Sequence, residues 1–566
     1  MQDGRIVEVG RVTAGAREVV DADGALVTPG WVDAHTHYDA QVTWDDTLEG
    51  SASNGVTTVV AGNCGVGFAP VRPDGFADLI DMMEGVEDIP GSALVEGMPW
   101  GEWESFPEYL DVLGRRSWTT DVAVQIGHGP LRYYVMGDRA VANDAATEAD
   151  IAQMAGLLAA AVRAGAAGFS TSRTKVHRSL RGGEFIPGTF APLEELMALG
   201  RAVAAGGGGV LQALPASGTA VGDVTPAGPE QASVGDEVEL FAEISRATGL
   251  PFVFTTVQTS DTERWREVLA RSAAHNATGA RLRPMVAARG TTVLSTLSSY
   301  HPFMRRPTFL RLGQALSFDA LVTEMRRPEV KAAILAEGDV PHDDVGSMEN
   351  FLATSFFTRG INKMYPLGEP LDYEPTEEMS FAAQAAAQHR DPFDVVYDYL
   401  LEDGGRAVAL FLGANYMDRN LDACRDMLLH PDTVTGLGDA GAHVTLACDM
   451  AAHTFALAHW ARDRSRGEGL PVELIVRKAT SVPATIWGMH DRGTVAVGKR
   501  ADVNVIDFEN LRSARPELLH DLPAGGSRFV QRAHGYIATV VDGTIVRRDD
   551  ADTGARPGRL LRRFDH

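Results

Sequence analysis

Short apolar segments alternate with amphipathic helical patterns along most of the chain. Eight of these segments have the length and composition of buried strands, and most are followed by a helical pattern. They span residues 31–34, 56–61, 122–126, 167–170, 209–213, 252–256, 282–286 and 434–437. Strands that alternate with helices favour parallel βα units, and eight is the number that a closed barrel needs. The pattern therefore predicts an α/β fold with a (β/α)8 TIM barrel.

The clearest helical pattern spans residues 147–164. Thr147 is a suitable N-cap for this segment, and Gly165 is a suitable stop signal. We therefore expect an amphipathic helix between two of the strands. The apolar side chains that recur on one face of it are Ile151, Met154, Leu158 and Val162.

Both ends of the chain carry a different pattern, in which apolar and polar residues alternate between turn residues. This alternation predicts short strands at residues 4–9, 18–27, 493–497, 502–506, 536–541 and 544–547. Strands from the two ends can pair with one another. We therefore predict a small β-sandwich domain formed by residues 1–30 and 490–550, with the catalytic barrel at residues 31–489.

Two stretches interrupt the rhythm of the barrel. They lie near residues 70–118, after the second strand, and near residues 288–430, between the seventh and eighth strands. The loops that follow the strands of a barrel build its active site. We therefore expect both insertions to lie over that site as lids or walls.

Composition narrows the classes of function. The chain is 45% hydrophobic and 22% charged, as in ordinary globular proteins. Its formal net charge of −25 argues against a nucleic-acid or anionic-membrane partner. The three cysteines are too few for a disulfide scaffold. We find neither a signal-peptide pattern nor the roughly 20 apolar residues that span a bilayer, so we expect a cytoplasmic protein.

The strongest chemical signal is the segment TPGWVDAHTHYD, in which an apolar strand leads into His35 and His37. Alternate residues of a strand share one face, so both imidazoles can bind one ion at the mouth of the barrel. The segment GLGDAGAH places Asp439 at the end of the eighth strand, which neighbours the first in a closed barrel. There Asp439 can bind the ion, or accept a proton from a water and deliver it to the leaving group.

Simpler interpretations of these residues stay open on this basis. An isolated pair of histidines is more often part of the surface or the core than of a metal site. Asp439 can cap a loop by accepting hydrogen bonds from backbone amides. Cys64 can be a small buried hydrophobe.

The chain also contains the motifs TPGWVDAHTHYDAQVTWD, GVTTVVAGNCGVGFAP and GTVAVGKRADVNVIDFENL. With the Asp439 segment, they resemble the N-acyl-D-amino-acid deacylase (D-aminoacylase) branch of the amidohydrolase superfamily, and the similarity covers nearly the whole chain. The resemblance implies a (β/α)8 barrel with a β-sandwich, a zinc site and hydrolysis of an amide attached to a D-amino acid. It implies that His35, His37 and Cys64 are metal ligands and that Asp439 is the catalytic acid/base. It also allows a homo-oligomer.

The chain departs from the family at two positions of the metal site. Family members usually carry a histidine at the end of the fifth strand and another at the end of the sixth, where this chain has Gln212 and residues 256–258 (TVQ). Glutamine and threonine are poor substitutes for imidazole, so we expect one zinc ion, bound by His35, His37, Cys64 and Asp439. Candidate replacements for the missing ligands are His128, His177 and, as a carbamylated lysine, Lys175.

Substrate recognition departs from the family as well. The family's lysine after the sixth strand and its arginine downstream of the catalytic aspartate are missing here, so specificity for a free D-amino-acid carboxylate is not expected to be retained. Arginines elsewhere could bind an acidic group through a bidentate fork. The residues expected to contact the substrate are His128, Arg132, Arg173, His177, Gln212 and His443.

These observations favour a metal-dependent hydrolase with a small-molecule substrate. A metal-activated water would attack an amide, such as an N-acyl amino acid or a cyclic amide, with Asp439 as general acid/base. Two alternatives stay open. One keeps the barrel and changes the reaction to deamination, lactone opening or decarboxylation, and the other is a non-catalytic binding protein.

Overall fold

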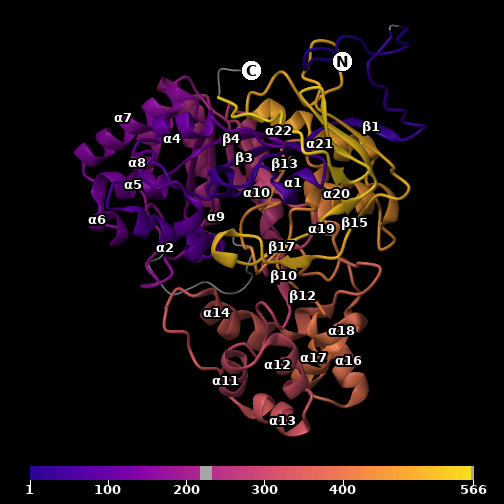
Figure 1. Ribbon diagram of the computed structural model, residues 1–566. Coiled ribbons are helices and arrows are strands. Elements are labelled where there is room, and N and C mark those ends of the chain that lie inside the picture. The colour runs from indigo at the N-terminus through magenta and orange to yellow at the C-terminus, as the bar shows by residue number, and fades with distance from the viewer. Residues whose placement is uncertain (14, 217–232, 563–566) are drawn as a thin grey trace.

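The computed structural model describes residues 1–13, 15–216 and 233–562. Figure 1 shows an upper body, in which the indigo, purple and yellow segments lie together, and a lower lobe formed by the middle of the chain. No helix in these ranges is long and apolar enough to cross a membrane.

Parallel strands form the centre of the upper body and lie in two sheets. All eight predicted segments coincide with these strands, the third being divided into two short strands. The predicted α/β class with parallel strands is therefore confirmed. The first sheet has the order β2 (Trp31–Asp33), β3 (Val56–Ala61) and β4 (Asp121–Val124). The second has the order β13 (Val434–Thr435), β9 (Leu282–Val286), β8 (Phe252–Thr255), β7 (Val210–Leu214), β6 (Gly168–Ser172) and β5 (Ile126–Gly127).

The two parallel sheets are connected at both sides. On one side, β4 continues into β5 through the single residue Gln125. On the other side, Thr36 forms an isolated parallel bridge with Ala440, and the backbone N–H of His37 donates to the carbonyl of Ala440 at 2.8 Å. In the described part of the chain, the first and last strands thus meet through this bridge beyond their ends, and no ladder joins β2 to β13.

The predicted helix at residues 147–164 is confirmed as α7 (Glu148–Ala164). Thr147 and Asp150 form a capping box at its start, and Gly165 ends it in the left-handed conformation, with φ of 119°. The other longer helices of the upper body are α2 (Phe76–Glu87), α4 (Phe106–Leu113), α5 (His128–Met136), α8 (Leu193–Ala205), α9 (Val234–Thr248), α10 (Arg264–Asn276), α19 (Asp422–Leu429) and α21 (Val472–Ala479).

The lower lobe is built from the second predicted insertion and has its own hydrophobic core. A three-stranded antiparallel sheet joins it to the upper body, in the order β10 (Thr292–Ser295), β12 (Ala409–Leu412) and β11 (Met364–Pro366). Its helical segments include α11 (Pro307–Ala315), α12 (Phe318–Met325), α13 (Pro328–Ala336), α14 (Met348–Phe351), the π-helix η2 (Leu352–Phe357), α16 (Phe381–Gln388), α17 (Pro392–Leu400) and α18 (Glu402–Gly405).

The two ends of the chain meet in a five-stranded antiparallel sheet. Its order is β1 (Leu26–Pro29), β14 (Val503–Ile506), β19 (Tyr536–Val541), β20 (Thr544–Arg548) and β21 (Ala551–Asp552). Two short hairpin-like pairs accompany it, namely β15 (Arg512–Ser513) with β18 (Ala533–His534) and β16 (Glu517–Leu519) with β17 (Arg528–Val530). The predicted pairing between the two chain ends is present in this sheet.

Three of the predicted terminal strands are wrong in whole or in part. Residues 4–9 form only isolated bridges, from Arg5 to Gln2 and to Arg500. Residues 18–25 and 493–497 form no strand. The alternating valines of these segments are exposed, for example Val9 at 54% and Val497 at 63%. Alternation predicts a strand only where a whole face is buried, and of the apolar side chains in these segments only Ile6 enters a core, against Ala501, Val503 and Val540.

A buried ionic cluster ties the parallel sheet to the end sheet. The guanidinium of Arg492 donates to Asp121 Oδ2 in β4 and to Thr58 Oγ1 in β3, both at 2.7 Å. The guanidinium of Arg500 lies 3.0 Å from the same carboxylate. All three charged side chains are at most 2% exposed. Asp121 is the fully buried carboxylate that the two cations share, and Asp491, Asp502 and Asp542 complete the cluster.

Replacing Asp121 by alanine should lower the free energy of unfolding by about 3–5 kcal/mol, because two buried guanidinium groups lose their shared carboxylate. Denaturant-induced unfolding measures this loss. The matched control is Asp111→Ala, which removes a largely exposed partner of Arg562 and should cost no more than about 1 kcal/mol. Equal losses in the two variants would contradict a structural role for the cluster.

Candidate active site

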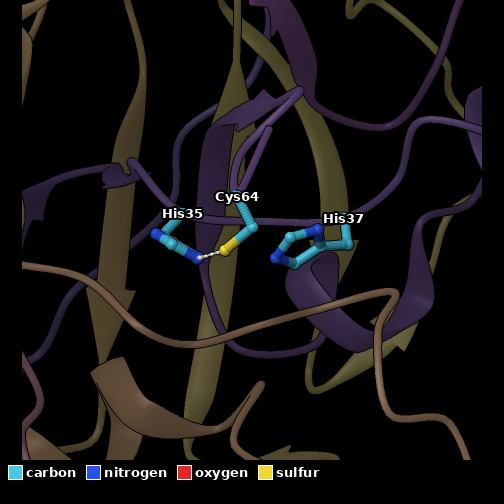
Figure 2. Close-up of side chains that lie close together, drawn as sticks. All are labelled: His35, His37 and Cys64. Carbon is cyan, nitrogen blue, oxygen red and sulfur yellow. Dashed lines mark hydrogen bonds between the residues drawn. The ribbon is translucent and has the colours of Figure 1, made fainter. Parts of the chain in front are cut away.

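Two histidines and a cysteine meet where the first two parallel strands end. His35 and His37 follow β2, and Cys64 follows β3. The sulfur of Cys64 lies 3.5 Å from Nε2 of His35, and Figure 2 shows it between the two imidazole rings. The centres of these rings are 5.3 Å apart. Because β2 and β3 are neighbouring parallel strands, their ends place all three side chains on one edge of the sheet.

The donor atoms of these residues point to one region. One ligand atom from each of His35, His37 and Cys64 lies within 4.8 Å of the other two, and all three residues are buried. Asp439 joins them from the far end of the chain, with Oδ1 at 3.2 Å from Nε2 of His35 and 3.8 Å from Nε2 of His37. The four residues predicted to bind a metal are therefore brought together.

The electrostatics of the site suit a cation. Burial lowers the pKa of His35 to about 3 and that of His37 well below its usual value, so both rings are neutral and can offer a nitrogen lone pair. Burial also raises the pKa of the Cys64 thiol and of Asp439, with nearby carboxylates adding to the effect. A bound divalent cation would reverse both of these shifts. Two neutral imidazoles with a thiol and a carboxyl form a donor set that fits zinc.

A further carboxylate supports this set from the first insertion. Oε1 of Glu87, the last residue of α2, lies 3.2 Å from Nδ1 of His37, and its Oε2 lies 3.7 Å from Nε2 of His443. The backbone N–H of His443 also donates to the carbonyl of Glu87. A carboxylate on the far nitrogen of a ligating histidine fixes the tautomer and direction of the ring. The sequence did not identify Glu87, because the only signal was that its insertion should lie over the site.

The donor atoms line a cavity of about 170 Å³. Its polar lining includes Glu87, His177 and His443 together with the four predicted ligands. Burial lowers the pKa of His177 to about 3 and that of His443 to about 4, so both are neutral hydrogen-bonding groups. Apolar side chains from both insertions form much of the remaining lining. The site is thus a mostly apolar chamber with its polar groups gathered around the donor atoms.

The six predicted substrate contacts fall into two groups. His177 and His443 line the cavity, and Gln212 lies next to it, where its Oε1 accepts from the backbone N–H of Cys64 at 3.2 Å. His128, Arg132 and Arg173 are not among the lining residues in the described part of the chain.

The side chains of these three residues instead contact buried glutamates of helices α8 and α9. Glu195 Oε1 lies 2.9 Å from Nε2 of His128 and accepts from Nε of Arg132 at 3.0 Å. Arg173 donates through Nε to Glu237 at 2.7 Å. Each contact holds helix α8 or α9 near the ends of the strands. Their role in substrate binding stays a prediction.

Residues 18–547 match the family model described as an amidohydrolase family. A D-aminoacylase of Alcaligenes xylosoxydans xylosoxydans is 26% identical over 99% of this chain and 92% of its own length. A solved D-aminoacylase, described for the functional role of its binuclear metal centre, matches with a TM-score of 0.62 and 22% identity, over 99% of this chain and 94% of that one. The N-acyl-D-glutamate deacylase of Bordetella bronchiseptica, solved with zinc and a phosphonate inhibitor, matches with a TM-score of 0.60 and 23% identity over the same shares.

Replacing Glu87 by glutamine should weaken zinc binding by about 10–100-fold, because the ring of His37 loses the carboxylate that orients it. Competition with a chelator measures the affinity. The matched control is Glu84→Gln, a change one turn earlier in the same helix, which should leave the affinity unchanged. An affinity equal to that of the wild type in Glu87→Gln would show that His37 is oriented without this contact.

Proposed function

The chain belongs to the amidohydrolase family, and we propose that it is a metal-dependent hydrolase that cleaves an amide bond other than a peptide bond. One observation carries the proposal. Ligand atoms of His35, His37 and Cys64 gather in a cavity large enough for a small molecule, and the carboxyl of Asp439 lies beside both imidazoles. The substrate is an N-acyl amino acid, a related amide or a cyclic amide.

The fold that presents these groups is inferred to be a closed (β/α)8 barrel with a β-sandwich built from residues 1–30 and 490–550. Two contacts support closure, namely the passage from β4 into β5 and the parallel bridge between Thr36 and Ala440. With β4 and β5 taken as one strand, the two sheets supply the eight strands of such a barrel.

One zinc ion would be held by His35, His37 and Cys64, with Asp439 as the fourth group. His35, His37 and Cys64 form the only metal-ligand cluster found within the described ranges, which favours a single ion. Zinc in such a site supplies a Lewis acid and lowers the pKa of water. A thiolate and two imidazoles are ligands that zinc prefers. Gln212 stands where relatives place a further histidine and contributes a hydrogen bond to Cys64 instead.

Asp439 is the proposed general base and acid. Its side chain is 26% exposed and faces the cavity beside the two histidines, so it can reach both a water and the substrate. It takes a proton from the attacking water and returns that proton to the leaving nitrogen. Oε1 of Glu87 lies 3.2 Å from Nδ1 of His37 and would orient that ring, whereas Oε2 lies 3.7 Å from Nε2 of His443, beyond hydrogen-bond distance.

His443 is the proposed donor to the substrate carbonyl. Its Nδ1 is buried and has no hydrogen-bond partner among the described residues, although the ring lines the cavity. A neutral imidazole that donates through this nitrogen stabilises negative charge that develops on the carbonyl oxygen. His177 lies in the same lining and is held through its Nδ1 by Ser172 at 3.0 Å.

The proposal predicts about one zinc per chain in the purified protein and a loss of both zinc and turnover in the double variant His35→Ala/His37→Ala. Asp439→Asn should keep most of the zinc and lower kcat by about 10²–10⁴-fold, because only the proton transfer is removed. Zinc is measured by elemental analysis, and turnover by amine release from N-acyl amino acids and amides of both hands.

The control is His389→Ala/His490→Ala, which removes two exposed histidines and should keep both zinc and turnover. A folded protein that binds no zinc would contradict the proposal, as would zinc that persists after removal of His35 and His37. Ammonia release, or decarboxylation without amine release, would keep the metal site and replace the reaction.

A further inference from the structure

We propose that Asp88 is a positioning residue, which fastens the lower lobe and the loop after β13 to helix α2 and thereby holds Glu87 against His37. The inference rests on the proposed function, because it concerns the metal site described there. It adds a residue that lies outside the cavity lining, and it is carried by hydrogen bonds between three segments around the site.

The carboxylate of Asp88 joins segments that are far apart in the sequence. Asp88 follows the last residue of α2 and has the left-handed conformation, with φ of 55°. Its Oδ1 accepts from the hydroxyl of Tyr300 at 2.6 Å, and its Oδ2 accepts from the hydroxyl and the backbone N–H of Thr445 at 3.1 and 3.3 Å. Tyr300 packs against the core of the lower lobe, and Thr445 lies in the loop that carries Asp439 and His443. One carboxylate therefore binds both insertions and the loop after β13.

The chain connects this carboxylate directly to the metal site. Glu87 immediately precedes Asp88, and its Oε1 lies 3.2 Å from Nδ1 of His37. The carbonyl of Glu87 also accepts from the backbone N–H of His443, two residues before Thr445. Residues joined by a planar peptide bond cannot shift independently of each other. The contacts of Asp88 therefore limit the positions from which Glu87 can reach His37.

The place of Asp88 separates this role from a contact with the substrate. Glu87 and His443 line the cavity. Asp88, Tyr300 and Thr445 are not among the lining residues within the described ranges. A change at Asp88 should therefore reach the metal site through the position of Glu87, without removing a group that meets the substrate.

The test measures zinc affinity by competition with a chelator in Asp88→Asn. Asparagine tolerates the left-handed conformation, but its amide cannot accept from both Tyr300 and the backbone N–H of Thr445. We expect the affinity to fall by about 3–10-fold in the wild-type background, because the orientation of His37 is loosened. In the Glu87→Gln background the same change should cost less than about twofold, because the residue that transmits the effect is already lost.

A matched pair at the other end of the same helix provides the control. Asp78, in the first turn of α2, accepts from the hydroxyl of Tyr133 as Asp88 accepts from Tyr300. Asp78→Asn should leave the zinc affinity within about twofold in both backgrounds. Tyr300→Phe breaks one Asp88 contact without changing a charge and should lower the affinity by about 2–5-fold, whereas Tyr133→Phe should not.

Hydrogen exchange of the zinc-free protein gives a second readout that does not depend on the metal. The backbone N–H of His443 is bonded to Glu87, and that of Thr445 is bonded to Asp88. Asp88→Asn should speed exchange in the peptide that contains both groups by at least about threefold, because its local opening becomes easier. Asp78→Asn should leave this exchange unchanged.

The outcomes separate this inference from the proposed function. An unchanged zinc affinity in Asp88→Asn overturns the inference, as does a loss of equal size in the Glu87→Gln background, and both results leave the metal site intact. If Asp88→Asn does not fold, the same comparison with Tyr300→Phe decides. A wild-type protein that binds no zinc contradicts the proposed function. Exchange then decides the inference, which faster exchange supports and unchanged exchange overturns.

Discussion

The close approach of His35, His37 and Cys64, with Asp439 beside both imidazoles, organises the structure around it. The imidazoles, the thiol and the carboxyl lose their hydration when they are buried together. A cation bound between them would supply the favourable polar interactions that water provided before. Neighbouring strands β2 and β3 bring the first three groups together, and the bridge between Thr36 and Ala440 adds Asp439 from a segment about 400 residues away. The buried cluster around Asp121 fixes the opposite side of the same strands to the end sheet. The first insertion then adds Glu87 behind His37, and the second adds apolar side chains to the lining of the cavity.

The parallel strands and the metal ligands could be predicted from the sequence because each has a local signal. Buried strands are short apolar runs, and His35 and His37 directly follow one of them. The terminal strands were harder, because exposed valines alternate in the same way as half-buried ones. Residues 493–497 have the pattern but stay exposed, whereas residues 536–541 have it and form β19 inside a sheet. Whether an alternating segment pairs depends on a partner surface, and the segment itself carries no information about that surface.

The parts of the site that the sequence did not identify come from the insertions. Glu87 ends an ordinary amphipathic helix, and nothing in that helix indicates that its end lies beside His37. The apolar side chains that the second insertion adds to the cavity lining also belong to the hydrophobic core of the lower lobe. Their sequence pattern is therefore that of a hydrophobic core. Arg132 and Arg173 illustrate the opposite case, because arginines after the strands suggested anion binding and lie instead in buried ion pairs with Glu195 and Glu237. Side chains near a strand end can turn toward the cavity or toward the helices, and tertiary packing decides between them.

X-ray absorption spectroscopy of the zinc-loaded protein would decide whether Cys64 binds the metal, because it reports the ligand atoms themselves. We expect one sulfur at about 2.3 Å and two imidazole nitrogens at about 2.0–2.1 Å from zinc, with the sulfur contribution lost in Cys64→Ser. A zinc environment of oxygen and nitrogen alone in the wild-type protein would contradict this expectation, because Cys64 would then lie beside the site without taking part in it.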